Sequence, residues 1–157
     1  MLRILILCHG NICRSPLAEV LVEAAVSNDP QLAGKVTIVS AGTSDEHLGE
    51  AMHANSARIL QTRGLRTTHR AQVFTPALAA TVDLVLAADR ANLRNGRAII
   101  RSSDRQPEIR LLRDFDQNAR GRDLDDPWGS PMSAYERTAA EISDAIPGLL
   151  AELRDRL

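Results

Sequence analysis

One short stretch of the chain, residues 8–15, combines the residue types that nucleophilic chemistry on an oxyanion requires. It reads Cys-His-Gly-Asn-Ile-Cys-Arg-Ser. Cys8 supplies a thiol, Gly10 allows a positive φ, and Arg14 can hold two anion oxygens with its planar guanidinium. Backbone amides that point inward at a helix N-terminus also bind negative charge. An anion held there would lie over Cys8, and the same positive field favours the thiolate, which is the nucleophilic form.

The spacing of six residues between Cys8 and Arg14 is a weak signal by itself, because the chain is rich in arginine. In the plainest alternative, Cys8 is a small buried residue at the end of a strand. That alternative does not explain why an arginine, which is costly to bury without a partner, follows in the same loop. We therefore interpret the stretch as an anion-binding loop with a cysteine nucleophile.

Two flanking elements must position this loop. Residues 2–7, which read Leu-Arg-Ile-Leu-Ile-Leu, are short, apolar and β-branched enough to be a buried strand. Residues 16–28 have apolar side chains at helical spacing, with Pro16 expected to open the helix and Ser15 to cap it. The candidate site is therefore a strand-to-helix loop.

The rest of the chain alternates between strand and helix patterns. Further strands are predicted at 36–40, 82–88 and 109–112, and helices at 50–63 and from Asp89 to about Asn95. A last helix is predicted to follow a capping box formed by Ser133 and Glu136. Pro147 is expected to bend or interrupt this last helix. Such alternation indicates an α/β fold with a parallel sheet and helices on both faces. Ligands of such sheets bind beyond the carboxyl ends of the strands. The loop at 8–15, the turn at 40–43 and Asp89 should therefore meet at one edge.

Composition narrows the class of protein. With 157 residues, 44% of them hydrophobic, and a net charge of −1, we expect a single globular domain over 1–157 and no nucleic-acid partner. Both cysteines lie in one loop, which fits a cytoplasmic protein better than a disulfide framework, and we find no export signal or membrane span. Cys8 and Cys13 have no second Cys/His pair at ligand spacing, so we expect no metal site.

The nine residues 8–16 resemble the signature loop of the low-molecular-weight protein tyrosine phosphatases, in particular a bacterial, actinobacterial-like branch. The resemblance continues through Ser-Ala-Gly-Thr at 40–43, Thr-Thr-His-Arg-Ala at 67–71, Ala-Ala-Asp-Arg-Ala-Asn-Leu at 87–93 and Asp-Pro-Trp at 126–128, and so covers nearly the whole chain. It implies a three-layer α/β/α sandwich with a four-stranded parallel sheet of order 2-1-3-4. It also implies hydrolysis of phosphotyrosine through a cysteinyl-phosphate intermediate, without a cofactor.

The resemblance assigns roles to individual residues. Cys8 would be the nucleophile and Arg14 the clamp on the phosphoryl group. The phosphate-binding residues would be His9, Gly10, Asn11, Ile12, Cys13, Arg14 and Ser15, and the residues that support the loop would be Asn11, Ser15, Ser40, His69 and Asp89. Cys13 is either simple packing or a second thiol that captures an oxidised Cys8.

A phenoxide leaving group needs a proton, so a carboxylic acid must reach the site. The chain has two Asp-Pro pairs. Asp29 ends the first helix at the far side of the sheet, whereas Asp126 follows the fourth strand and can fold back over the ligand edge. The Asp-Pro pair followed by an aromatic residue also resembles the general-acid loop of the family. We therefore assign the acid to Asp126, in preference to Asp123 and Asp125.

Three departures from the family pattern concern the substrate. An aromatic wall residue after the turn at 40–43 is replaced by Asp-Glu-His at 45–47, so that Glu46 forms this wall and is expected to repel acidic peptides. Trp128 is followed by Gly129, which leaves one ring to stack on a phenol. His9 stands where the family often has a small or apolar residue. We assign no role to His47 or His53.

Three alternative functions stay open at this point. The first is an arsenate reductase; the thioredoxin-coupled kind needs cysteines after Cys13, which the chain lacks, but mycothiol-dependent kinds do not. The second is a protein-arginine phosphatase, although that branch has threonine where this chain has Ile12. The third is a non-catalytic phosphate-binding module. The expected partners are a phosphotyrosine protein, with a bacterial tyrosine kinase as one candidate, and the oxyanions phosphate, sulfate and vanadate.

Overall fold

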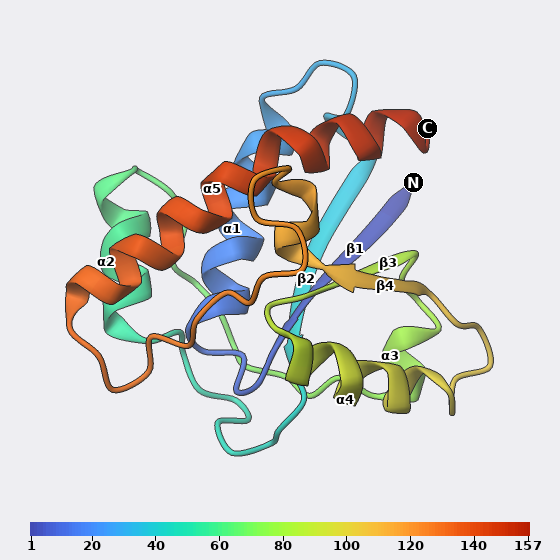
Figure 1. Ribbon diagram of the computed structural model, residues 1–157, viewed down its shortest axis with the longest axis horizontal. Coiled ribbons are helices and arrows are strands. Elements are labelled where there is room, and N and C mark those ends of the chain that lie inside the picture. The colour runs from blue at the N-terminus through green and yellow to red at the C-terminus, as the bar shows by residue number, and fades with distance from the viewer.

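A four-stranded parallel sheet forms the centre of the computed structural model, which describes residues 1–157 (Figure 1). Its strands are β1 (Leu2–Cys8), β2 (Val36–Gly42), β3 (Leu84–Ala87) and β4 (Glu108–Leu111). Their order is β2-β1-β3-β4, and all three pairings are parallel. The predicted fold class and strand order are therefore confirmed.

Helices cover both faces of this sheet (Figure 1). They are α1 (Arg14–Ser27), α2 (Ala54–Thr62), α3 (Pro76–Ala79), α4 (Arg90–Ile100), the 3₁₀ helix η1 (Leu112–Phe115) and α5 (Met132–Asp155). Helices α1, α2 and α5 pack with one another over one face, and α3 and α4 lie over the other. None of the helices has both the length and the apolar character that crossing a membrane requires.

The central strand β1 explains why the core has two halves. Ile4 and Ile6 belong to the apolar cluster on the α1 and α5 side, whereas Leu5 and Leu7 belong to the cluster on the α4 side, and all four are fully buried. A strand that is buried on both faces reads as a continuous apolar run rather than an alternating one. This is the pattern that the sequence shows before Cys8.

Several predicted boundaries shift in the structure. Helix α1 begins at Arg14 and not at Pro16, and its N-cap is Cys13, so the assignment of Ser15 as the cap is wrong. Helix α2 begins at Ala54, and α4 continues to Ile100, because Ile100 packs against the sheet.

The expectations for the last helix are also corrected. Its N-cap is Pro131 and it starts at Met132, so Ser133 lies inside the helix and makes no capping box. Pro147 does not interrupt α5, which is helical on both sides of it. The buried side chains Ile142, Leu149 and Leu153 hold both parts of this helix on the core, and their burial outweighs the hydrogen bond that proline cannot donate.

The carboxyl ends of β1, β2 and β3 meet at one edge of the sheet, as predicted. The backbone N–H of Thr43 donates to the carbonyl of Cys8 at 2.9 Å, and that of Leu124 donates to the carbonyl of Ala88 at 2.8 Å. Gly42 lies so close to the loop after β1 that an added Cβ would be 2.7 Å from the carbonyl oxygen of His9. The end of β2 therefore needs glycine to support that loop.

A second close approach joins α5 to η1, the segment that leads into residues 116–131. A Cβ added at Gly148 would overlap the carbonyl oxygen of Phe115. Backbone is in contact with backbone here, so no side chain can move to relieve the overlap. By contrast, a Cβ at Gly96 in α4 would meet only the ends of the Ile109 and Leu7 side chains, each at 2.7 Å.

We predict that Gly148→Ala lowers the free energy of unfolding by about 1–3 kcal/mol, because the extra methyl group forces η1 away from α5. Chemical denaturation followed by circular dichroism measures this change. Gly96→Ala is the matched control and should cost less, since its neighbours are flexible side chains. A gain in stability for Gly148→Ala, as alanine brings at an open helix position, would contradict the packing described here.

Candidate active site

Asn11 holds the loop after β1 from behind. Its backbone is in the left-handed region, with a φ of 58°. Its side-chain amide donates to Ser15 Oγ at 2.8 Å and to Ser40 Oγ at 2.9 Å, and its Oδ1 accepts from the backbone N–H of Gln72 at 2.9 Å. The Nε2 of His69 donates to the carbonyl of Asn11 at 2.6 Å. The loop is therefore tied to β2 and to the segment at 69–72.

The sulfur of Cys8 lies at the centre of this loop. Cys8 is buried, and its Sγ lies 2.9 Å from Ser15 Oγ and accepts from the backbone N–H of Asn11 at 3.3 Å. The backbone amides of residues 12–15 donate to no group of the protein. Unpaired amides at the start of a helix of 14 residues provide a binding site for an anion.

Arg14 is a buried cation beside that sulfur. Its Nη1 donates to Asp89 Oδ2 and to the carbonyl of Leu124, both at 2.7 Å, and its Nη2 lies 3.8 Å from Asp126 Oδ2. Burial acts to lower the pKa of Arg14, but Cys8 and the carboxylate of Asp89 more than offset this and raise the pKa above its ordinary value. Arg14 is therefore charged at every physiological pH.

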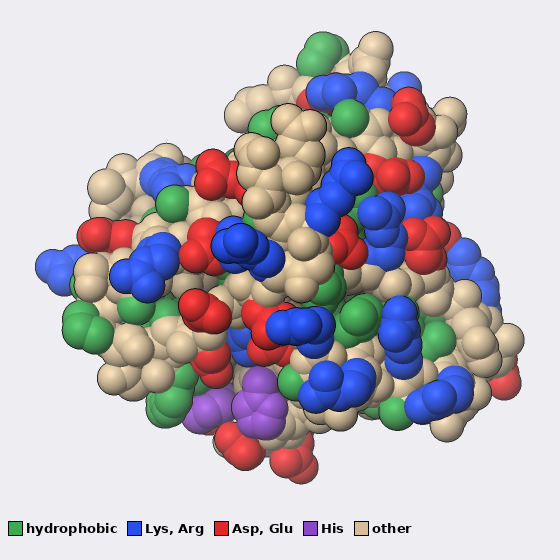
Figure 2. Space-filling model, in the orientation of Figure 1, with side chains coloured by type: hydrophobic (Ala, Val, Ile, Leu, Met, Phe, Trp, Pro, Cys, Tyr) green, Lys and Arg blue, Asp and Glu red, His purple; other side chains and the backbone are tan.

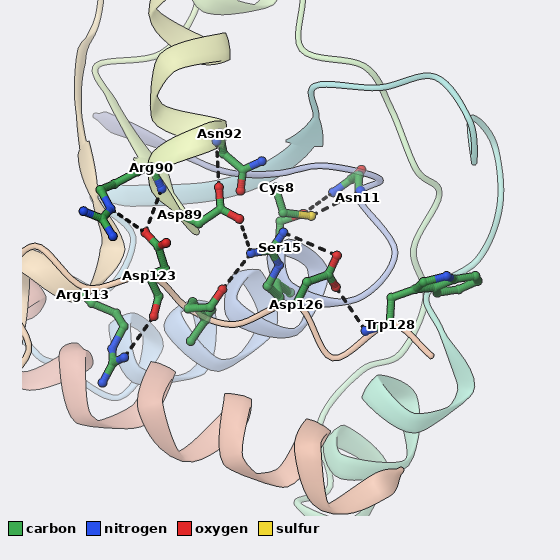
Figure 3. Close-up of polar contacts among 12 residues, drawn as sticks. Cys8, Asn11, Ser15, Asp89, Arg90, Asn92, Arg113, Asp123, Asp126 and Trp128 are labelled. Atoms are coloured by element: carbon green, nitrogen blue, oxygen red, sulfur yellow. Dashed lines mark hydrogen bonds and ion pairs between the residues drawn. The ribbon is translucent and has the colours of Figure 1, made fainter. Parts of the chain in front are cut away.

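Asp89 serves two purposes at once. It is the N-cap of α4, where its Oδ1 accepts from the backbone N–H of Asn92 at 2.7 Å, and its other oxygen holds Arg14. The helix cap that the sequence predicts is thus also the residue that orients the guanidinium (Figure 3).

The three aspartates at positions 123, 125 and 126, in the loop before α5, differ in position. Asp126 lines the same pocket as Cys8 and Arg14, and its Oδ1 accepts from the backbone N–H of Trp128 at 3.1 Å. Asp125 lines only a neighbouring groove against α5, which Asp126 also borders, and Asp123 accepts from the backbone N–H of Arg90 at 3.0 Å. Of these three aspartates, only Asp126 therefore lines the pocket that holds Cys8.

Aromatic rings form one side of the pocket mouth. Trp128, which is 55% exposed, lies 5.3 Å from the ring of His47 and 5.6 Å from that of His53, measured between ring centroids. His53 in turn stacks on the buried Tyr135 at 4.8 Å. Our assignment of no role to these two histidines is corrected, because His47 lines the pocket and His53 supports Trp128.

The predicted wall residue Glu46 also lies at the mouth. Its carboxylate is 3.6 Å from His9 Nε2, and both side chains are more than half exposed. His47 pairs with Glu50 at 2.9 Å. The two histidines that line the pocket therefore each face a carboxylate, and this part of the mouth is polar and acidic.

Cys13 differs from Cys8 in its surroundings. Its Sγ lies 3.5 Å from the hydroxyl of Tyr135, and both cysteines are free thiols. Burial raises the pKa of the Cys13 thiol to about 11, a shift that the hydrogen bond with Tyr135 only partly opposes. Cys13 is therefore a protonated, weakly nucleophilic thiol, and a redox role for it stays a prediction.

The structure brings the predicted site residues together. All of them lie in the pocket or in the hydrogen-bonded support behind the loop. Sequence reasoning missed Gln72, whose side-chain amide donates to the carbonyl of Ser40 at 2.9 Å, and it missed the carbonyl of Leu124. Backbone partners leave no signal in a sequence, whereas His47 could have been noticed as the neighbour of Glu46.

Comparison with known proteins gives consistent matches along the chain. The family model described as "Low molecular weight phosphotyrosine protein phosphatase" matches residues 3–157. A low molecular weight protein-tyrosine-phosphatase of Streptomyces coelicolor is 34% identical over 157 residues, covering 99% of this chain and 95% of the relative. Low molecular weight protein-tyrosine phosphatase A of Mycobacterium tuberculosis is 36% identical, covering 99% and 94%.

The fold also matches solved structures. The crystal structure of a Drosophila arginine phosphatase superposes with a TM-score of 0.86 at 22% identity, over 96% of each chain. At this identity the match supports the fold alone. Proteins with this fold therefore include phosphatases of more than one kind. The substrate of this chain must be inferred from the residues of its pocket.

We predict that iodoacetamide at pH 7 modifies Cys8 and leaves Cys13 unmodified, which peptide mass spectrometry can measure. In Cys8→Ser, labelling of Cys13 should be slow at pH 7 and rise about tenfold per pH unit until the pH reaches the thiol pKa of about 11. Unfolded protein, in which both thiols react, is the control. Labelling of folded Cys13 at pH 7 as fast as a free cysteine would show that the thiol is not held in the state described.

Proposed function

Because the chain belongs to the low molecular weight phosphotyrosine protein phosphatase family, we propose that Cys8, Arg14 and Asp126 carry out its phosphatase reaction. The observation that supports these roles best is their common pocket. One small cleft is lined by the sulfur of Cys8, the guanidinium of Arg14 and the carboxylate of Asp126. Residues 12–14, whose backbone amides have no partner in the protein, also line it.

In the first step, the Cys8 thiolate attacks the phosphorus atom. A phosphorus–sulfur bond forms while the bond to the tyrosine oxygen breaks, and Asp126 gives its proton to that oxygen. Negative charge on the transferring group is stabilised by Arg14 and by the loop amides. The preformed contacts of Arg14 with Asp89 and Leu124 hold the guanidinium in place, so little reorganisation is needed.

In the second step, the ionised Asp126 takes a proton from a water molecule, which attacks the phosphorus atom. The phosphorus–sulfur bond breaks and the thiolate of Cys8 leaves. The hydroxyl of Ser15, 2.9 Å from Sγ, can donate to the sulfur as its charge returns. Inorganic phosphate is released, and the starting state is restored.

The mouth of the pocket supports an aryl phosphate as the substrate. Trp128 and His47 present ring faces beside the cleft, where a phenol ring can pack. The natural partner in this proposal is a protein that carries phosphotyrosine, for which a tyrosine kinase is one candidate. Free oxyanions such as phosphate, sulfate and vanadate would compete for the same amides.

The arginine phosphatase alternative is less well supported by the pocket. Ile12 lines the cleft with an apolar side chain and offers no hydrogen bond to a guanidinium. The relatives from Streptomyces coelicolor and Mycobacterium tuberculosis, at 34% and 36% identity over nearly the whole chain, are called tyrosine phosphatases. Hydrolysis of phosphoarginine in place of phosphotyrosine would overturn this preference, and reduction of arsenate would favour the reductase alternative.

We predict that Cys8→Ser abolishes hydrolysis of phosphotyrosine peptides but still binds phosphate, because the amides and Arg14 remain. Calorimetric titration with inorganic phosphate measures the binding, and phosphate release measures the rate. Ser15→Ala, which keeps the nucleophile, is the comparison and should retain part of the rate. A substantial rate in Cys8→Ser would show that the reaction does not pass through the sulfur.

We predict that Asp126→Asn slows hydrolysis of a phosphotyrosine peptide more than that of nitrophenyl phosphate. A general acid is worth about 10²–10⁴ in rate, and it matters most for a basic leaving group. Tyrosine phenoxide has a pKa of about 10, whereas nitrophenoxide is a much weaker base. Rapid-quench measurement of the first step with both substrates gives the comparison, and the alkaline limb of the pH profile should weaken.

Asp125→Asn is the matched control for this experiment. It changes an aspartate to the same amide one residue away, at a side chain that lines the groove against α5 but not the pocket that holds Cys8. It should leave the ratio of the two rates unchanged. Equal slowing of both substrates in Asp126→Asn, or a larger effect in Asp125→Asn, would place the acid on another residue.

A further inference from the structure

Helix α4 carries a row of arginines that the reaction does not use. Arg90, Arg94, Arg97 and Arg101 are all exposed, and at 100° per residue they fall within roughly 60° of the helix circumference. The opposite side of α4 is buried through Asn92, Gly96 and Ile100. We call these four residues the arginine row; it is about 16 Å long.

The arginine row has almost no acidic partners. Arg90 pairs with Asp123 at 3.3 Å, but Arg94, Arg97 and Arg101 form no ion pair, and α4 itself contains no acidic residue. Neighbours in the row are three or four residues apart, a spacing at which like charges destabilise a helix. Figure 2 shows Lys and Arg side chains gathered over the part of the surface that α4 occupies in Figure 1.

The row begins at the catalytic pocket. Arg90 directly follows Asp89, which holds Arg14, and it contacts the loop that carries Asp126. In Figure 3, Arg90 and Trp128 lie on opposite sides of Cys8. Glu46 and its neighbour His47 belong to the Trp128 side, because His47 packs on that ring. The row therefore starts on one side of Cys8, where Arg90 pairs with Asp123, and the carboxylate of Glu46 lies on the other side.

We propose that the arginine row is a docking surface for an acidic segment of the phosphoprotein substrate, on one flank of its phosphotyrosine. This inference rests on the proposed function and adds a substrate class to it. An extended peptide rises by about 3.3 Å per residue, so the row spans about five peptide residues. Carboxylates in this segment would pair with Arg94, Arg97 and Arg101, while the acidic side of the mouth excludes an acidic segment on the other flank.

The test uses three phosphotyrosine peptides of equal length. The first has five glutamates N-terminal to the phosphotyrosine, the second has five glutamates C-terminal to it, and the third has serines in place of the glutamates. The wild-type enzyme should show a higher kcat/KM for one acidic flank, mainly through KM, and no gain for the other. The gain should disappear in high salt, because exposed charges are screened. Equal gains from both flanks, or no gain from either, would overturn the proposal.

Paired variants assign the effect to the row. Arg94→Gln/Arg97→Gln should reduce the gain about fivefold, as expected for two exposed ion pairs, and should leave nitrophenyl phosphate hydrolysis unchanged. Arg58→Gln/Arg63→Gln removes the same charge from two exposed arginines of α2 and its C-cap and should keep the gain. An equal loss in both variants would show that net charge alone is responsible.

Three outcomes distinguish a peptide-docking surface from a membrane contact and from an error in the proposed function. Binding of the wild type to phosphatidylserine vesicles, without any peptide preference, would show that the row is a membrane contact and would overturn the proposal. Failure of the wild type to hydrolyse even the serine peptide would overturn the proposed function itself. Hydrolysis of the serine peptide without a preference for acidic flanks would overturn the docking surface alone.

Discussion

The buried charge of Arg14 is the constraint on which the active-site architecture depends. A guanidinium removed from water needs hydrogen-bond and charge partners, or its burial costs several kcal/mol. Here the partners come from two separate segments: Asp89 follows β3, and the carbonyl of Leu124 and the carboxylate of Asp126 both belong to the loop before α5. The hydrogen bonds and ion pairs that Arg14 requires therefore join the loop after β1 to the segment that carries Asp126.

Anion binding is a second constraint, and it explains why the hydrogen bonds that support the loop lie behind it and not inside it. The amides that face the pocket must stay unpaired to bind an anion, so the loop cannot be stabilised by its own backbone hydrogen bonds. Asn11 replaces them with side-chain hydrogen bonds to Ser15, Ser40 and Gln72. Its left-handed backbone, which asparagine adopts more readily than most residues, turns the chain tightly enough to bring its own amide onto the sulfur.

Much of this arrangement could be predicted from the sequence, for identifiable reasons. The order of the strands, the edge at which Cys8, Ser40 and Asp89 meet, and the cap at Asp89 follow from periodicity, from the rules of parallel sheets and from the family resemblance. Helix ends were harder, because Ser133 and Glu136 fit a capping box that tertiary packing overrides.

Contacts that depend on tertiary structure could not be predicted in this way. The stack of His47, Trp128, His53 and Tyr135 joins three segments whose proximity no local pattern reveals. The carbonyl of Leu124 is likewise invisible in a sequence, since every residue has one. A pattern of residue types finds groups that react, but it does not find the neutral groups that hold them.

The division of the pocket into a floor and a mouth has a consequence for inhibitor design. The floor consists of backbone amides, Cys8 and Arg14, each held by contacts behind it. A phosphate mimic bound at the floor therefore contacts the groups that the family signature specifies. The mouth is built from the exposed side chains of Glu46 and Trp128 and the half-buried His47, where this chain departs from the family pattern. A selective compound should therefore gain its discrimination from a cationic aromatic group that reaches Glu46 and Trp128, with only modest affinity required of its anionic head.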